Sequence, residues 1–280
     1  MMKLHLLPLP ALAIAAVIAA PAQAQEGTSQ EVIVVSAQRA NQTEVIAGGT
    51  LGVLGAKDAL DVPFVVRTFD ESLILNQQPL TLGEVLENDP SIRTTYAFGN
   101  AAEQFVIRGF PLYGDDIGMN GLYGISPRQL IAPELYSGVQ VLNGANAFLN
   151  GAAPGGTGIG GNVSLQLKRA GDSPLTRVTA SYLSDSHFGG SADIARRFGE
   201  NDQFGVRVNG AYRSGDVAVN DEFRRTIVGG ASFDWTTDNL RVTLDGAYQR
   251  YEVNHLRPQV VIGNGAIPEV PEADLNYGPS

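Results

Sequence analysis

A glycine-rich segment is the first pattern in the sequence that could do chemistry. Residues 156–161 (Gly-Thr-Gly-Ile-Gly-Gly) have the G-x-G-x-x-G spacing, whose backbone amides can approach a pyrophosphate. Such a site needs a strand before the glycines and a helix after them, because the helix N-terminus attracts the phosphate. Here Pro154 precedes the motif and a strand-like segment, 162–168, follows it. We therefore attribute the spacing to glycine density and do not predict a dinucleotide site.

Other side chains suited to catalysis or metal binding are few and scattered. His187 and His255 lie far apart and lack the spacing of a zinc site or of a histidine-based triad. Asp115 and Asp116 are adjacent, and neighbouring strand residues point to opposite faces, so they are not expected to form an acid–base pair. The chain has no cysteine, which excludes thiolate catalysis, cysteine-ligated zinc and disulfides. We predict no catalytic residue, no metal site and no cofactor.

Composition points to a turn-rich β protein. Of 280 residues, 33 are glycine and 17% are charged, whereas ordinary domains have about 7% glycine and about 25% charged residues. The hydrophobic share of 44% disfavours disorder, and the glycine content disfavours a helix bundle. The net charge of −10 argues against a nucleic-acid-binding surface.

The N-terminus has the pattern of a secretory signal peptide, predicted over residues 1–24. Lys3 gives the positive region, residues 12–20 form the apolar run, and Ala22-Gln23-Ala24 is a cleavage site. The alternative, a membrane anchor, needs roughly 20 apolar residues, which the run does not reach.

Residues 25–56 are polar and glycine-rich, which predicts a flexible segment. It contains a β-branched run with polar neighbours: Glu31, Val32, Ile33, Val34, Val35 and Ser36. Periodicity alone favours a short edge strand folded onto the next domain. The alternative is an exposed strand that is available to a partner's sheet edge.

Residues 57–169 are predicted to form a compact mixed domain. Thr81 and Glu84 fit a capping box at the start of a short helix, which ends before Pro90. Strands are predicted over 62–69, 105–110, 139–142 and 163–168.

From residue 170 onward, apolar and polar residues alternate in runs of about ten residues that turn signals separate. The runs are 178–182, 188–198, 204–213, 226–235 and 240–249, and in the second run Arg196 falls on the apolar side. This period, with aromatic residues near the ends, is typical of transmembrane barrel strands. A soluble sandwich with one wet face would show the same alternation. The signal peptide and the hairpin spacing favour the barrel, with a polar face lining a water-filled lumen.

Several motifs, in order, resemble the N-terminal part of a TonB-dependent outer-membrane receptor of the siderophore-receptor type. Residues 31–36 resemble the TonB box, and 105–110 resemble the plug strand that ends in I-R-G-F. The further matches are 117–122 at the D-G or N-G position, 135–144 at V-E-V-L-K-G, 154–169 at the close of the plug, and 196–208 as early barrel strands.

The resemblance implies an α+β plug, with a small mixed sheet and short helices, followed by the first antiparallel strands of a transmembrane β-barrel that is incomplete in this chain. It implies a protein of the Gram-negative outer membrane, in contact with outer-membrane lipid and not with nucleic acid. A ferric siderophore would bind at the cell surface and be imported when TonB, driven by the ExbB–ExbD motor, takes up the TonB box as an added strand. Aromatic rings suit an organic chelator and arginine an anionic iron complex, so the ligand residues expected on the apical plug loops are Tyr96, Phe98, Tyr113, Tyr123 and Arg128.

The sequence departs from the family at the expected lock between plug and barrel. Arg108 can pair with a glutamate of the barrel wall, as the family's motif implies, but Asn143 replaces the usual second basic residue. The lock is therefore expected to be weaker or rearranged.

Other functions fit parts of this pattern. Within the family the cargo could be cobalamin, another metal chelate or a glycan. An exported adhesin or passive porin is a further alternative, although a porin has no use for a plug or for the run 31–36. A truncated fragment that does not transport is the third, because five strands cannot close a barrel. We expect the gene to continue beyond Ser280 with more strands.

Overall fold

The computed structural model describes residues 45–50, 55–95, 102–144, 149, 151–183, 185–257 and 272–276. The predicted signal peptide and the run 31–36 lie outside these residues. Among the described helices, none has the length and apolar character needed to cross a membrane.

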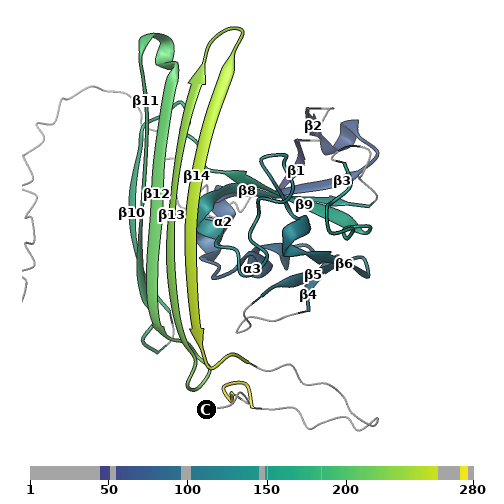
Figure 1. The fold of residues 1–280 in the computed structure, drawn as a ribbon, viewed down its shortest axis with the longest axis vertical. Coiled ribbons are helices and arrows are strands. Elements are labelled where there is room, and N and C mark those ends of the chain that lie inside the picture. Colours follow the sequence, from purple (N-terminus) through teal and green to yellow (C-terminus); the bar gives the residue numbers. More distant parts are fainter. Residues whose placement is uncertain are drawn as a thin grey trace, which may run out of the picture.

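The described chain forms two parts that lie side by side (Figure 1). One is a small mixed domain that contains β1 to β9 and the helices, and we call it the small domain. The other is a tall, slightly bowed sheet of five strands, β10 to β14, which we call the tall sheet. The small domain packs against the concave side of the tall sheet.

The larger sheet of the small domain has the strand order β2-β1-β3-β8-β9-β7, and its only parallel pair among the described strands is β7 with β9. Its strands are β1 (Val45–Thr50), β2 (Ala56–Asp58), β3 (Val65–Asp70), β7 (Gly118–Met119), β8 (Tyr136–Asn143) and β9 (Gly161–Leu167). Strand β1 lies inside the segment expected to be flexible. It forms because its backbone extends the sheet beside β3, a pairing that needs no period in the side chains.

A second, antiparallel sheet contains β4 (Ile92–Thr94), β5 (Gln104–Ile107) and β6 (Phe110–Tyr113). The single strand predicted over 105–110 is wrong, because the chain turns between β5 and β6. Arg108 and Gly109 both have positive φ, 50° and 88°, as in the two-residue hairpin turns that suit the twist of paired strands.

Two short α-helices pack on these sheets, α2 (Glu71–Gln77) and α3 (Leu82–Leu86), with 3-10 turns η2 (Ala59–Asp61), η3 (Gly114–Asp116) and η4 (Pro133–Leu135). Helix α3 confirms the predicted short helix, but the predicted capping box is wrong in detail. The Thr81 side chain makes no capping bond, and the Gly83 N–H instead donates to Glu103 Oε1 at 2.9 Å. Glu84 Oε2 accepts from the Leu80 N–H at 2.6 Å. A carboxylate from a distant segment thus takes the place expected for the threonine.

The hydrophobic core lies between the two sheets of the small domain and the helices. Its largest fully buried side chains include Tyr136, Phe69, Phe105, Leu82 and Leu86. Ala211 and Val228 of the tall sheet belong to the same cluster, so the core continues across the contact between the two parts.

The tall sheet confirms the five alternating runs as neighbouring antiparallel strands. They are β10 (Leu175–Tyr182), β11 (Phe188–Phe198), β12 (Phe204–Asp216), β13 (Phe223–Thr236) and β14 (Arg241–Asn254), with η5 (Glu200–Asp202) in the turn after β11. Two short turns lie at the same end of the strands, namely residues 199–203 between β11 and β12 and residues 237–240 between β13 and β14.

Candidate functional site

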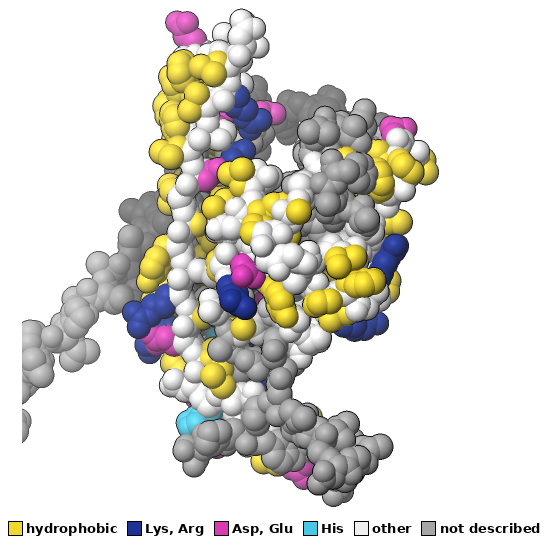
Figure 2. Space-filling model, turned by 45° about the vertical axis from the view of Figure 1, so that its right-hand side comes forward, with side chains coloured by type: hydrophobic (Ala, Val, Ile, Leu, Met, Phe, Trp, Pro, Cys, Tyr) yellow, Lys and Arg dark blue, Asp and Glu magenta, His cyan; other side chains and the backbone are white. Residues whose placement is uncertain are grey.

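The two faces of the tall sheet differ in polarity. The outer face carries many exposed apolar side chains, and Figure 2 shows hydrophobic side chains along the left of the view. They include Val178, Tyr182, Phe188, Ile194, Phe198, Val208, Tyr212, Leu244 and Tyr248. The inner face carries buried polar side chains, Asp193, Arg207, Asn209, Arg213, Arg224 and Asp234, beside the apolar Ala211 and Val228. The alternation is therefore as predicted, but in this part of the sheet the polar face packs on the small domain and does not line an open lumen.

Aromatic side chains mark two levels on the outer face. Near the short turns, Phe204 stacks with Phe198, Phe233 and Trp235, with ring centroids 5.6, 6.2 and 6.1 Å apart. Tyr212 lies eight residues further along β12 than Phe204. Eight residues span about 27 Å of strand, or about 20 Å across a membrane at a tilt of about 40°. The spacing suits the apolar band of a barrel, which is about 25 Å tall.

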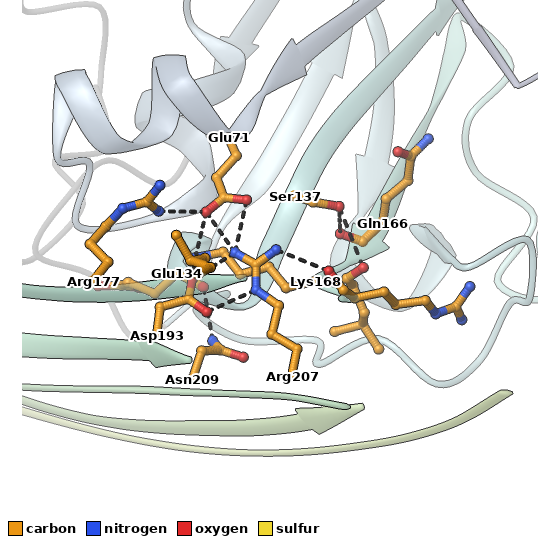
Figure 3. A network of polar contacts seen from close by, with 12 residues as sticks. Glu71, Glu134, Ser137, Gln166, Lys168, Arg177, Asp193, Arg207 and Asn209 are labelled. Carbon is orange, nitrogen blue, oxygen red and sulfur yellow. Dashed lines mark hydrogen bonds and ion pairs between the residues drawn. The ribbon is translucent and has the colours of Figure 1, made fainter. Parts of the chain in front are cut away.

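The centre of the inner face carries a buried network of charges (Figure 3). Arg207 of β12 donates to Asp193 of β11 through Nε at 2.8 Å and Nη2 at 2.6 Å, and Nη2 lies 2.7 Å from Glu71 Oε1 of α2. Lys168 Nζ, just after β9, lies 3.1 Å from Asp193 Oδ2 and 3.5 Å from Glu71 Oε1. Arg177 of β10 pairs with Glu71 at 2.8 Å.

These charges compensate one another in a place that excludes water. The side chains of Lys168, Asp193 and Arg207 are only 5 to 7% exposed. Burial alone would raise the pKa of the Glu71 carboxyl, but Lys168, together with Arg207 and Arg177, outweighs it and holds this pKa below its ordinary value. Glu71 therefore stays ionised. It joins helix α2 to strands β10 and β12 and to the segment just after β9.

Around this network, side chains of the tall sheet donate hydrogen bonds to main-chain carbonyl oxygens of the small domain and of the segment before β10. The pairs are Arg213 with Pro79, Tyr251 with Leu80, Gln249 with Leu130, Asn209 with Glu134, Arg207 with Arg169, and Arg197 with Ala170. Their donor–acceptor distances run from 2.7 Å for Gln249 to 3.4 Å for Tyr251. The tall sheet therefore recognises the backbone of its neighbour as well as its charges.

A third contact joins β14 to the turn after β7. Asn120 Nδ2 donates to Asp245 Oδ2 at 3.0 Å, and Arg169 Nη2 pairs with the same oxygen at 2.6 Å. Asn120 Oδ1 accepts from the Leu167 N–H at 3.0 Å. Asn120 and Gly121 have φ of 49° and 83°, so an Asn-Gly hairpin turn presents the amide side chain to the tall sheet.

The two residues expected to form the lock, Arg108 and Asn143, take no part in these contacts between the small domain and the tall sheet. The Arg108 side chain is exposed and has no ion-pair partner among the described residues, so its role stays a prediction. Asn143 is buried, and its side chain contacts Asp89 at 3.4 Å and Ser91 at 3.0 Å. Arg67 pairs with the fully buried Asp89 at 3.0 Å, so an arginine from β3 supplies the cation beside Asn143.

Burial alone would raise the pKa of Asp89, but the hydrogen bonds from Ser91 and the charge of Arg67 hold it below its ordinary value. Asp89 thereby ties the start of β4 to β3 and β8 as an ionised group. Asn143, which stands where the family's motif has a basic residue, therefore lies in the interior of the small domain.

Of the expected ligand residues, Tyr96 and Phe98 lie outside the described residues. Tyr113 is 38% exposed at the end of β6, and the backbone of Arg128 lies against Gly114, so these two side chains come from adjacent segments. The Arg128 side chain is 67% exposed, with Nε 4.0 Å from Asp115 Oδ2. Tyr123 is half-buried, and its hydroxyl accepts from Asn162 Nδ2 at 2.5 Å, so it faces β9.

The glycine-rich segment also has a partner in the chain. Asp116 is buried and accepts from the Gly155 N–H at 2.5 Å, the Thr157 N–H at 2.8 Å and the Thr157 hydroxyl. A carboxylate thus occupies amides that a phosphate would need, and β9 follows the glycines. Asp115 points to Arg128, so the two aspartates diverge, but the predicted reason is wrong, because they lie in the 3-10 turn η3 and not in a strand. In the part of the chain that the structure describes, no group of His, Asp and Glu is placed to hold a metal ion.

Sequence reasoning missed the buried network. Asp193 and Arg207 stand on the polar side of the predicted strands, which was the available signal, but Glu71 and Lys168 carry no local mark. Arg207 and Glu71 are 136 residues apart, and only the docking of the two parts brings them together.

Comparison with known proteins assigns these features to a family. Residues 58–157 match the family model described as the TonB-dependent Receptor Plug Domain. The chain is 44% identical over 238 residues to the ferrichrome receptor FcuA of Yersinia enterocolitica, a match that covers 85% of this chain and 31% of that protein.

Solved structures agree in fold. The ferric preacinetobactin receptor BauA of Acinetobacter baumannii superposes with a TM-score of 0.80 at 39% identity, over 84% of this chain and 35% of that one. The pyoverdine receptor FpvA of Pseudomonas aeruginosa shares the fold, with a TM-score of 0.63 at 17% identity over 77% of this chain and 32% of that one. The chain spans about a third of the length of these relatives.

Proposed function

Because the chain belongs to the TonB-dependent receptor family, we propose that the whole protein is an outer-membrane receptor that binds a ferric siderophore at the cell surface and imports it. The small domain is its plug, and the tall sheet is part of the wall around the plug. Energy for import comes from TonB, which takes up residues 31–36 as an added strand. The protein binds and moves its ligand and does not transform it.

The observation that carries this proposal is the seating of the plug. A small domain held by buried charges and backbone hydrogen bonds against the polar face of a sheet, whose other face is apolar, is the arrangement of a gated pore in a membrane. An adhesin needs no such seated domain, and a passive porin would be blocked by it.

The relatives support a siderophore as cargo. FcuA is named a ferrichrome receptor and BauA a ferric preacinetobactin receptor, and they are 44% and 39% identical to this chain over the matched residues. Tyr113 and Arg128, which are exposed on adjacent segments, are the described residues we propose to meet the ligand. An aromatic ring and a guanidinium suit the apolar and anionic parts of an iron chelate.

The experiment uses the complete gene in a host that lacks its own receptor for the chosen chelate. Uptake of radioactive iron is measured with ferrichrome and with ferric preacinetobactin, and cobalamin uptake is the comparison for another cargo. Val34→Pro removes a backbone donor that strand addition needs, and Val34→Ile is the matched control that keeps a β-branched residue.

We expect Val34→Pro to abolish iron uptake while ligand binding to cells persists, and Val34→Ile to transport normally. Equal uptake by both variants would exclude energised import through this segment. Uptake of cobalamin without either iron chelate would replace the siderophore by another cargo.

A further inference from the structure

The Asn-Gly turn after β7 combines an exposed amide side chain with an exposed backbone nitrogen. Asn120 and Gly121 are the two turn residues, and hydrogen bonds of 2.8 and 2.9 Å between the main chains of the flanking residues close the hairpin. Both turn residues are exposed, and within the described part of the chain the Gly121 N–H has no hydrogen-bond partner. A Cβ placed on Gly121 would meet no atom within 4 Å outside its chain neighbours. The Gly121 nitrogen is therefore accessible to the side chain that precedes it.

These two residues can react with each other. The Gly121 nitrogen can form a bond to Cγ of Asn120 and lose its proton, while the bond from Cγ to Nδ2 breaks and the amide leaves as ammonia. The product is a five-membered succinimide, and water opens it at either of its two carbonyl carbons to leave aspartate or isoaspartate. Water is the only co-reactant, and nothing is oxidised or reduced. A glycine favours the first step because it has no Cβ to block the attack.

Contacts of the Asn120 side chain restrain this reaction while the plug is seated. Nδ2 donates to Asp245 Oδ2 at 3.0 Å, and Oδ1 accepts from the Leu167 N–H at 3.0 Å. The amide is thus held at both ends, by β14 and by β9, whereas ring closure needs its Cγ to turn onto the Gly121 nitrogen. Asp245 also pairs with Arg169 at 2.6 Å, which fixes the acceptor in place. Ring closure therefore requires that the contact with Asp245 opens.

Water for the second step is available at this turn. Asn120 and Gly121 line a cavity of about 1340 Å³ between the plug and β14, which Thr243 and Gln249 line from the side of the wall. A cavity of this size holds many water molecules, because one molecule needs only about 10–15 Å³. The succinimide can therefore be hydrolysed without unfolding of the plug.

The other two Asn-Gly pairs within the described residues lack these properties. Asn143 is 6% exposed, and the Gly144 N–H donates a backbone hydrogen bond of 2.8 Å. Asn209 is 8% exposed in β12, where its Nδ2 donates to a main-chain carbonyl oxygen at 3.1 Å, and Gly210 lies between the paired strands β11 and β13. The three pairs are identical in sequence, so only the fold separates the reactive one from the protected ones.

We propose that Asn120–Gly121 is a site of spontaneous deamidation that the contact with Asp245 holds in check. Either product places a second carboxylate beside Asp245 where a donor stood, and isoaspartate also lengthens the backbone of the hairpin turn. The modification therefore weakens the contact between the plug and β14. Because ring closure needs this contact to open, the modified fraction records how often the plug leaves β14.

The test follows deamidation at each Asn-Gly pair in the purified full-length receptor. The protein is incubated at mildly alkaline pH in water enriched in heavy oxygen, and digested peptides are analysed by mass spectrometry. We expect Asn120 to react about tenfold faster than Asn143 or Asn209, since these two need the plug core or the sheet to open. Asp245→Ala should speed the reaction at Asn120 about fivefold, as for the loss of one ordinary hydrogen bond. Thr243→Ala, on the same face of β14, is the matched control and should leave the rate unchanged.

Reaction at either buried pair as fast as at Asn120 would overturn the proposal, and this comparison uses the unaltered receptor alone. So would an Asp245→Ala variant that reacts no faster than the unaltered receptor, or an equal acceleration in Thr243→Ala. Heavy oxygen in the product separates deamidation during the incubation from any that preceded it. Transport is not measured in this experiment, so its failure would leave the proposed function of the receptor untouched.

Discussion

Replacing Asp193 by asparagine tests whether the buried network seats the plug. The carboxylate accepts two hydrogen bonds from Arg207 and one from Lys168, and its side chain is 7% exposed. Asparagine keeps the shape but presents an NH2 group to one of these cations. Three cations, Lys168, Arg207 and Arg177, would then share the single carboxylate of Glu71.

The expected cost follows from burial. Removing one partner of a buried ion pair costs about 3–5 kcal/mol, because the other charge stays out of water without compensation. The matched control is Glu252→Gln, which removes a carboxylate that is 31% exposed on the outer face of the same sheet. An exposed pair is worth about 0–1 kcal/mol, so the control should change little.

Hydrogen exchange of the α2 amides measures this difference in the full-length receptor. A loss of 3–5 kcal/mol corresponds to exchange faster by about 100-fold to 4000-fold when reclosing is faster than exchange, so that the opening equilibrium sets the rate. Arg177→Gln, which removes one partly exposed contact to Glu71, gives a milder variant should Asp193→Asn fail to assemble, with an expected loss of about 1 kcal/mol. Protection of α2 within threefold of the unaltered receptor in both variants would show that the network does not hold the plug.

Two further predictions concern the plug. Burial raises the pKa of Glu103 to about 7 from 4.5, so the folded plug binds this proton more tightly than the unfolded chain does. The stability that this proton contributes to the fold is therefore fully present below pH 4.5 and is lost as the pH rises through 7. Glu103→Gln, which keeps an acceptor for the Gly83 N–H, should reduce the difference in unfolding free energy between pH 5 and pH 8 by about 2–3 kcal/mol, and an unchanged difference in denaturant titrations would contradict this. Asn120→Asp places two carboxylates together at Asp245 and should cost about 1–3 kcal/mol, seen as faster exchange of the β7 amides. Asn120→Asp/Asp245→Asn restores a donor and should recover part of that protection, and a double variant as weak as the single one would refute the contact.

The strands of the wall could be predicted because each carries its own signal. One face of β12 is the apolar outer face and the other packs on the plug, so Val206 and Val208 alternate with Arg207 and Asn209. This alternation is visible in the strand's own sequence, without knowledge of distant residues. Helix α3 was predicted because its apolar residues repeat at helical spacing. Helix α2 was missed because its buried apolar residues, Leu73 and Ile74, are adjacent and do not repeat at helical spacing.

The contacts of the candidate site could not be predicted in the same way. Glu71 and Arg177 are separated by 106 residues, and Asn120 and Asp245 by 125, so no local pattern relates them. The resemblance to a family indicated a charged lock and named Arg108, but it could not show that Arg67 supplies the cation beside Asn143. That arrangement depends on the pairing of β3 with β8, where Val65 lies opposite Asn143.

The two kinds of contact that hold the plug differ in what they require of the sequence. A carbonyl oxygen such as that of Pro79 or Leu130 is in place whenever the backbone has folded correctly, whatever side chain the residue carries. A buried charge is favourable only while each partner is present, because its desolvation is otherwise uncompensated. Hydrogen bonds to carbonyls therefore allow the plug surface to change in sequence without losing its seat. The network around Glu71 instead makes the seat sensitive to single groups, so it is at Asp193 and Arg207 that a small change should release the plug.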